Sequence, residues 1–369
     1  MVFVSNNFKF LELKIVIAFQ ISDGYIWFSM ARIQDLLKDK NSKINYTQIR
    51  NNYPWIYRKK QKCILSPDSD GLLCGLFMSH YLDWEIVGFY DGKVCVLKNG
   101  VSAFDEDVCF LDIEIYRKGI KSMGHHMLSV YNSALPDDWS IKFKECLQPN
   151  LMRGYDKNNF RLKYPLATIH MLIGVLEEII DIRVEESAIF PLLFTDGTFN
   201  VMFSYPENVI NWWKYLDIKD NSKLLRNIFM GEDYTTYKLM LEMDNFFRER
   251  DEISISGERG DRLKISNKDS SSYNIDKHSH NYKINDGAKA RCKSFLRLLA
   301  KHTKWNYNDQ RWCFEEMNLM QFSKSDFLSR GWTIKKDNWK SLMEINPLSW
   351  AMTSGKNIEF TIETPDKLI

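Results

Sequence analysis

The sequence predicts an α/β protein, with a mostly parallel sheet flanked by helices and a smaller α+β domain at the C-terminal end. Two short apolar runs, 63–65 and 108–111, have the composition of buried strands. The longer apolar segments 72–82 and 165–180 have the length of helices, and the second carries apolar residues at helical intervals. Polar residues that could bind a ligand follow the strands.

The first run ends at two carboxylates one residue apart, Asp68 and Asp70, in a turn bounded by Pro67 and Gly71. A turn at the C-terminal edge of a strand is where open α/β sheets place their ligands. Hard divalent cations prefer oxygen ligands, so both aspartates are candidate metal ligands. The alternative is a solvated acidic turn in which one aspartate caps the next helix.

Three later points combine an apolar segment with side chains of the kind that bind metals. Asp112 directly follows the run 108–111, and the pair His125-His126 comes shortly after it. Asp196 follows the apolar segment 191–194, which we expect to be another strand. The order Asp-x-Asp, Asp, His-His, Asp along one chain indicates a single site rather than unrelated turns.

In these residues the chain resembles the DHH phosphoesterase superfamily, which includes RecJ-type single-strand exonucleases, nano-RNases, cyclic-dinucleotide phosphodiesterases and family II pyrophosphatases. The resemblance covers residues 60–205 and rests on four short elements in order: Ser66-Pro67-Asp68-Ser69-Asp70-Gly71, Leu111-Asp112, Gly124-His125-His126 and Thr195-Asp196-Gly197-Thr198. It implies a metal-dependent phosphodiesterase that acts on single-stranded nucleic acid.

The resemblance also implies two bound metal ions, Mn²⁺ or Mg²⁺. Asp112 would bridge the two ions, Asp68 would serve one of them, and Asp70, His125 and Asp196 would serve the other. A metal-activated water would then attack the phosphodiester, without a nucleophilic side chain.

Catalytic and substrate-binding roles follow from the same comparison. Asp112, as the bridge, and His126, as a hydrogen-bond partner of the scissile phosphate, are the expected catalytic residues. Arg117, Lys118 and Lys121 lie between the second and third elements, and we expect them to bind phosphate oxygens of the substrate.

Two positions depart from the family pattern. Ser66 stands where the family has an Asp or His ligand, and Gly124 stands where it has an Asp before the two histidines. Glu114, two residues beyond Asp112, is a candidate replacement ligand. The departures keep a second hypothesis open, in which the chain is a catalytically inactive module that binds nucleic acid or a protein partner.

Two further alternatives remain at this stage. A phosphodiesterase for short or cyclic nucleotides would use the same metal site. A HAD-type phosphatase could use Asp68-Ser69-Asp70 as its Asp-x-Asp nucleophile element, although the histidine pair has no role in such an enzyme.

The length of 369 residues suggests two or three domains. We expect an N-terminal extension over 1–60, a phosphoesterase domain over 61–250, a flexible linker over 251–288 and a small basic domain over 289–369. The extension has strand-like segments at 8–19 and 25–30 and a helical segment at 31–38. In the last domain, tryptophans alternate with lysines and arginines, a mixture that suits either stacking on unpaired bases or an ordinary core.

Bulk composition narrows the class of protein. The apolar content of 44% and charged content of 27% are those of a globular protein, and the net charge of +2 means that any nucleic-acid surface is local. No stretch is long and apolar enough to span a bilayer, and the N-terminal residues argue against a signal peptide. Seven scattered cysteines without a Cys-x-x-Cys spacing favour the reducing cytoplasm. Nothing in the sequence indicates the oligomeric state.

Overall fold

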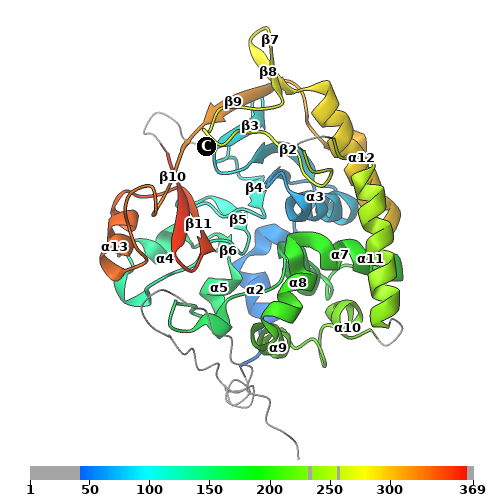
Figure 1. The fold of residues 1–369 in the computed structure, drawn as a ribbon, viewed down its shortest axis with the longest axis horizontal. Coiled ribbons are helices and arrows are strands. Elements are labelled where there is room, and N and C mark those ends of the chain that lie inside the picture. Colours follow the sequence, from blue (N-terminus) through cyan, green and yellow to red (C-terminus); the bar gives the residue numbers. More distant parts are fainter. Residues whose placement is uncertain (1–41, 232–234, 256–257, 364–369) are drawn as a thin grey trace, which may run out of the picture. The chain divides into compact units, whose positions relative to one another are not determined.

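The structure, a computed structural model, describes residues 42–231, 235–255 and 258–363. The elements expected at 8–19, 25–30 and 31–38 lie outside these residues. Asn41–Ile369 form one compact unit, whose elements are drawn in Figure 1.

A nine-stranded sheet runs through this unit in the order β6-β5-β4-β1-β2-β3-β9-β8-β7. Strands β6, β5, β4, β1 and β2 pair in parallel, whereas the pairs from β2 to β7 are antiparallel. The α/β class is confirmed, and the sheet is mixed. Its strands are β1 (Lys62–Leu65), β2 (Glu85–Tyr90), β3 (Val94–Lys98), β4 (Val108–Leu111), β5 (Lys121–Met123), β6 (Cys146–Leu147), β7 (Ile275–His278), β8 (Asn281–Ile284) and β9 (Met317–Gln321).

Helices cover one face of the sheet, where they share the largest apolar core with β1, β2 and β4. Figure 1 shows α11 and α12 next to each other, and α12 also packs against α3 and α7. The helices are α2 (Tyr46–Asn52), α3 (Ser69–Leu82), α4 (Trp139–Lys142), α5 (Pro149–Met152), α6 (Thr168–Leu176), α7 (Ile189–Phe194), α8 (Thr198–Ser204), α9 (Pro206–Tyr215), α10 (Lys223–Met230), α11 (Thr236–Asp251), α12 (Asp286–Thr303) and α13 (Lys336–Glu344).

The first motif forms a tight connection from β1 to α3. Asp68 is the N-cap of α3 and accepts a hydrogen bond from Gly71 N at 3.2 Å, which satisfies one free donor of the first turn. A Cβ at position 71 would lie 2.0 Å from the carbonyl oxygen of Ser66. Glycine is therefore required here by the close approach of the helix to the strand end.

Gly71→Ala is expected to lower the free energy of unfolding by about 2–3 kcal/mol, because backbone atoms have to move to make room for the methyl group. Gly355→Ala is a matched control, since a Cβ at that exposed glycine meets no atom within 4 Å. Chemical denaturation measures both variants, and equal stability of the two would contradict the steric account.

Two expected elements differ in the structure. Segment 191–194 belongs to helix α7, so the predicted strand before Asp196 is wrong. A short, fully buried helix has the same unbroken apolar sequence as a buried strand, and composition alone does not separate them. The predicted helix 165–180 is the shorter α6, and all of its residues are buried because α2, α3 and α10 pack around it.

Residues 251–288, expected as a linker, contribute to the main sheet. They include β7 and β8, and the buried side chains of Leu263 and Ile265 join the large core. The amide of Leu263 donates to the carbonyl oxygen of Pro67 at 2.8 Å. This hydrogen bond holds segment 258–268 beside the first motif.

The C-terminal region builds a second sheet in the order β10-β12-β11, from β10 (Ser323–Asp326), β11 (Ser349–Ser354) and β12 (Asn357–Ile362). Trp339 and Trp350 are buried in a core that this sheet shares with α13 and α4. Trp305 and Trp312 are also buried. These tryptophans therefore pack inside the protein, as in the alternative interpretation, and do not form a surface for stacking on bases.

Among the described residues, none of the helices combines the length and hydrophobicity needed to cross a membrane. All seven cysteines lie in the described part of the chain and are free thiols. Six of them are buried, where they pack as small apolar side chains.

Candidate metal centre

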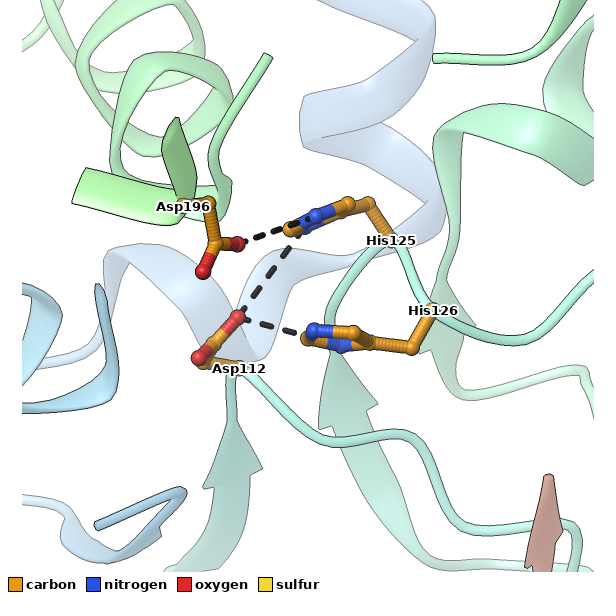
Figure 2. A group of neighbouring side chains, drawn as sticks. All are labelled: Asp112, His125, His126 and Asp196. Atoms are coloured by element: carbon orange, nitrogen blue, oxygen red, sulfur yellow. Dashed lines mark ion pairs between the residues drawn. The ribbon is translucent and has the colours of Figure 1, made fainter. Parts of the chain in front are cut away.

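The C-terminal ends of three neighbouring parallel strands bring the predicted site together. Asp68 follows β1, Asp112 follows β4, and the two histidines follow β5, while Asp196 enters from the turn between α7 and α8. Ligand atoms of Asp112, His125, His126 and Asp196 all lie within 4.8 Å of one another (Figure 2). We call these four residues the Asp/His cluster; it could hold a metal ion.

Asp112 is the most buried member, with 1% of its surface exposed. It adopts a left-handed backbone conformation (φ 60°), as does Asp196 (φ 50°), and such conformations of non-glycine residues are frequent at functional sites. Burial raises the pKa of Asp112 well above its usual range, and the nearby Asp70 and Asp68 raise it further. Its Oδ2 has no hydrogen-bond partner among the described residues. A cation would satisfy this buried oxygen.

The two histidine rings stack on each other with centroids 4.4 Å apart. His125 Nε2 lies 3.1 Å from Asp196 Oδ2, and Nδ1 of each histidine lies 4.0 Å from Asp112 Oδ1. Burial opposes ionisation of Asp196, but the adjacent His125, together with His126 and His170, lowers the pKa of Asp196 to about 2. Asp196 is therefore an ionised carboxylate, ready to bind a cation.

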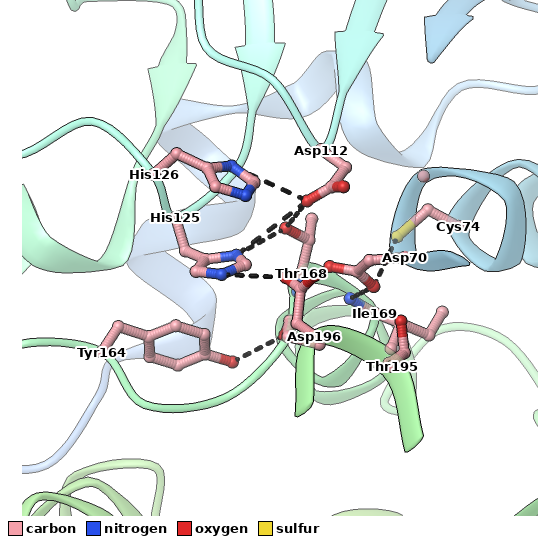
Figure 3. Close-up of polar contacts among 12 residues, drawn as sticks. Asp70, Cys74, Asp112, His125, His126, Tyr164, Thr168, Ile169, Thr195 and Asp196 are labelled. Carbon is pink, nitrogen blue, oxygen red and sulfur yellow. Dashed lines mark hydrogen bonds and ion pairs between the residues drawn. The ribbon is translucent and has the colours of Figure 1, made fainter. Parts of the chain in front are cut away.

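Thr168 connects the members of the site (Figure 3), and sequence reasoning did not identify it. Its hydroxyl donates to Asp112 Oδ1 at 2.7 Å and lies 3.0 Å from His125 Nδ1. When Asp112 is ionised, the single hydroxyl proton points to it, so His125 Nδ1 has to be the donor in the second contact. The ring is then oriented with Nε2 toward Asp196, as a metal-binding histidine requires.

Asp70 has a different position from the one predicted. Its two carboxylate oxygens accept hydrogen bonds from the amides of Thr168 at 2.6 Å and Ile169 at 3.2 Å, at the start of α6. Burial, with Asp196 nearby, raises the pKa of Asp70 to about 6. Asp70 thus lies behind the Asp/His cluster and holds Thr168 in place, outside the group of four ligands.

Asp68 and His126 occupy the solvent side of the site. Asp68 is half-buried and lines the two cavities described below. Burial lowers the pKa of His126, but the adjacent Glu114 carboxylate, together with Asp196 and Asp68, raises it to about 9.

The predicted substrate-binding residues lie away from these cavities. Arg117 pairs with Glu363 at 3.0 Å and donates to the carbonyl oxygen of Pro347 at 2.9 Å, so its guanidinium has a structural role. Lys121 donates to the carbonyl oxygen of Glu106. Lys118 is exposed. Among the residues that line either cavity next to the Asp/His cluster, none of the three predicted cations occurs.

Other cations surround the site instead. The first cavity, of about 540 Å³, extends from Asp112 and His126 to the C-terminal sheet, and the second, of about 590 Å³, lies beside Asp196. Asp68 and Arg262 line both cavities. The cations of the first are Lys93, Arg262, Lys264, Lys268 and Lys324, and those of the second are Arg250, Arg259 and Arg262.

Arg262 and Lys268 differ from the other cavity cations in their contacts. Neither side chain forms a hydrogen bond or ion pair within the described ranges, whereas Lys324 pairs with Glu359 and Arg259 with Asp261. The Lys264 ammonium also lacks such a partner, but it lies 4.3 Å from the centroid of the Tyr273 ring. Arg262 and Lys268 are both exposed. Their charges are therefore available to an anion that enters the first cavity.

We compared the chain with known protein families, curated proteins and solved structures. No protein-family model, curated protein or solved structure matches this chain.

Proposed function

We propose that this protein is a metal-dependent phosphodiesterase that hydrolyses single-stranded nucleic acid. The observation that carries the proposal is the composition of the first cavity. Its lining includes the carboxylate of Asp112 and the ring of His126 together with the side chains of Arg262 and Lys268. Carboxylates and imidazoles bind divalent cations, and the unpaired cations complement phosphate oxygens, so the lining suits a metal-bound phosphodiester.

We propose that the site binds two ions, Mn²⁺ or Mg²⁺. Asp112 Oδ2 has no hydrogen-bond partner among the described residues, and His125 adds an imidazole nitrogen to the donor set. Imidazole favours Mn²⁺ over Mg²⁺, which takes oxygen ligands. Asp112 would contact both ions, with Asp68 on one side and His125 and Asp196 on the other. When bound, such ions lower the pKa of a water and neutralise charge on the phosphodiester.

The chain's own residues have separate tasks in this proposal. Thr168 fixes the orientation of Asp112 and His125 through its hydroxyl. His126 donates a hydrogen bond to the phosphate, and Arg262 and Lys268 stabilise the charge that develops on its oxygens.

Two cavities that meet at Asp68 and Arg262 suit a strand better than a single small molecule. With the scissile phosphate at this junction, one neighbouring nucleotide would lie in each cavity. Phe199 and Phe247 line the second cavity and are half-buried, so this cavity offers aromatic contact to a base. The free thiols are consistent with our proposal that the protein works in the cytoplasm.

A phosphodiesterase for short or cyclic nucleotides is the second candidate, because each cavity has the size of a small-ligand site. Assays with Mn²⁺ on labelled single-stranded DNA and RNA, dinucleotides and cyclic dinucleotides decide between the two. Rates that increase with strand length support the strand enzyme, and a preference for dinucleotides or cyclic dinucleotides supports the second candidate. Binding of single strands without turnover by folded, Mn²⁺-loaded protein would instead identify an inactive binding module.

Arg262→Ala is expected to raise KM for a single-stranded oligonucleotide about tenfold, which corresponds to about 1.4 kcal/mol for one lost phosphate contact. Lys118→Ala removes an exposed cation outside both cavities, and we expect KM to stay within twofold of its original value. Steady-state kinetics measure both variants. A larger KM effect at Lys118 than at Arg262 would place the substrate on the surface that the sequence predicts and not in the cavity.

A further inference from the structure

We propose that Glu114 is the residue that positions His126, and that position 124 is a glycine because the Glu114 carboxylate fills the space of its missing side chain. The catalytic consequence rests on the proposed function, whereas the positioning itself does not. Glu114 thus supplies beside His126 a carboxylate that position 124 lacks.

The Glu114 carboxylate is buried and firmly held. Glu114 is only 1% exposed. Its Oε1 accepts hydrogen bonds from Met127 N and Gln148 Nε2, both at 3.0 Å. Oε2 has no hydrogen-bond partner among the described residues and lies 3.7 Å from His126 Nδ1. One oxygen therefore anchors the group, and the other is directed at the histidine.

The closest neighbour of Gly124 is this carboxylate. A Cβ at position 124 would lie 2.8 Å from Glu114 Oε2, 2.9 Å from its Cδ and 3.2 Å from the backbone nitrogen of Ile113. Gly124 is outside the left-handed region in which glycine is favoured by its backbone conformation. The shortest contacts that exclude a side chain here are with the Glu114 carboxylate, and the backbone nitrogen of Ile113 adds a third.

The local backbone brings the two positions together. Ile113 forms an antiparallel bridge with Met123, and the Asp112 amide donates to the carbonyl oxygen of Met123 at 2.8 Å. The segment after β4 thereby runs beside the segment after β5. A carboxylate at position 114 can therefore take the place of one at position 124, and the rest of the site need not change.

The consequence for His126 is a defined ring orientation. Its Nδ1 faces Glu114 Oε2 and, at 4.0 Å, Asp112 Oδ1. An Nδ1–H directed at these carboxylates leaves Nε2 as the nitrogen that faces the first cavity, which His126 lines. Carboxylates that hold the second nitrogen of a functional histidine commonly set its tautomer in this way. Glu114 is therefore a positioning residue.

Glu114→Gln tests the positioning with little change in shape, because a glutamine oxygen can still accept from Met127 N. We expect kcat on a single-stranded oligonucleotide to fall about 10- to 100-fold, with KM and Mn²⁺ affinity unchanged. Long-range ¹H–¹⁵N spectra of histidine-labelled protein, assigned with His126→Gln, should show loss of the Nδ1–H signal of His126. Glu106→Gln, an exposed control, should leave both measurements unchanged.

Moving the carboxylate provides a second test. Gly124→Asp alone should disturb the site, because the new side chain collides with Glu114, and Glu114→Ala alone should reduce kcat. The double variant Glu114→Ala/Gly124→Asp should exceed both single variants in kcat and recover the Nδ1–H signal. An unchanged His126 spectrum in Glu114→Gln overturns the inference even if the enzyme is active. An altered spectrum in a protein without turnover supports the positioning and removes the proposed function.

Discussion

Asp112→Ala is expected to lower the Mn²⁺-dependent kcat on single-stranded oligonucleotides by at least about 10³-fold, the size of effect seen when a group central to metal-assisted hydrolysis is lost. Asp112 lies at the centre of the Asp/His cluster, 4.0 Å from Nδ1 of both histidines. Its removal takes away a carboxylate that lies close to both of them and leaves the Thr168 hydroxyl without its acceptor.

Glu106→Ala is the matched control, because Glu106 is an exposed acid six residues earlier in the chain. Its kcat should be unchanged. Circular dichroism and thermal unfolding establish that both variants fold. Turnover by Asp112→Ala near the original rate would remove the proposed mechanism, since no other carboxylate in the described part of the chain occupies this position.

Metal-free protein is expected to be most stable near pH 4 and to lose stability as the pH rises toward 9. A carboxyl whose pKa is raised by folding binds more protons in the folded state than in the unfolded state, so its ionisation destabilises the fold as the pH rises. For Asp70, a pKa raised from 3.8 to about 6 corresponds to on the order of 3 kcal/mol, lost between pH 4 and 6. Asp112 extends this loss to higher pH.

His126 and Asp196 determine how stability changes at high pH and at low pH, respectively. The pKa of His126 is raised by folding, from 6.5 to about 9, so its contribution is present below pH 6.5 and is lost as the pH rises through 9. The pKa of Asp196 is lowered from 3.8 to about 2, so its contribution is present above pH 4 and is lost toward pH 2. Together these groups place the stability maximum in the mildly acidic range.

Mn²⁺ should reverse the loss at neutral pH, because it replaces the protons among the buried carboxylates. Thermal unfolding with EDTA or Mn²⁺ at several pH values measures the effect. Asp112→Asn removes one buried negative charge, so it should be more stable than the original protein in EDTA at pH 8 and should gain little from Mn²⁺. A Tm that is insensitive to Mn²⁺ in the original protein would contradict a metal site at this position.

The positions of most site residues could be predicted from the sequence because they follow short buried strands. Apolar runs ending at Asp68, Asp112 and the histidine pair become neighbours once β1, β4 and β5 pair in parallel. The Asp/His cluster then forms at one edge of the sheet. Asp196 is also part of it, although the segment before it is a helix and not a strand.

Local apolar patterns could not predict the role of Asp70 or identify the cations that line the cavities. Asp70 and Asp68 have the same local sequence signal, and only the packing of α6 against α3 turns Asp70 toward backbone amides. Arg262 reaches the site through the hydrogen bond of Leu263 to Pro67, across almost two hundred residues of sequence. Arg117 is near in sequence, yet Glu363 and the carbonyl oxygens around it occupy its guanidinium.

By itself, the sequence determined the α/β class and the strand ends at which the acidic and imidazole side chains lie. Local apolar patterns predict which segments are buried strands and where each strand ends. Only the tertiary structure decided which carboxylates face a cation, which cations remain unpaired, and why position 124 has no side chain. These outcomes depend on contacts between distant segments, and a local pattern carries no information about the partner that a side chain meets after folding.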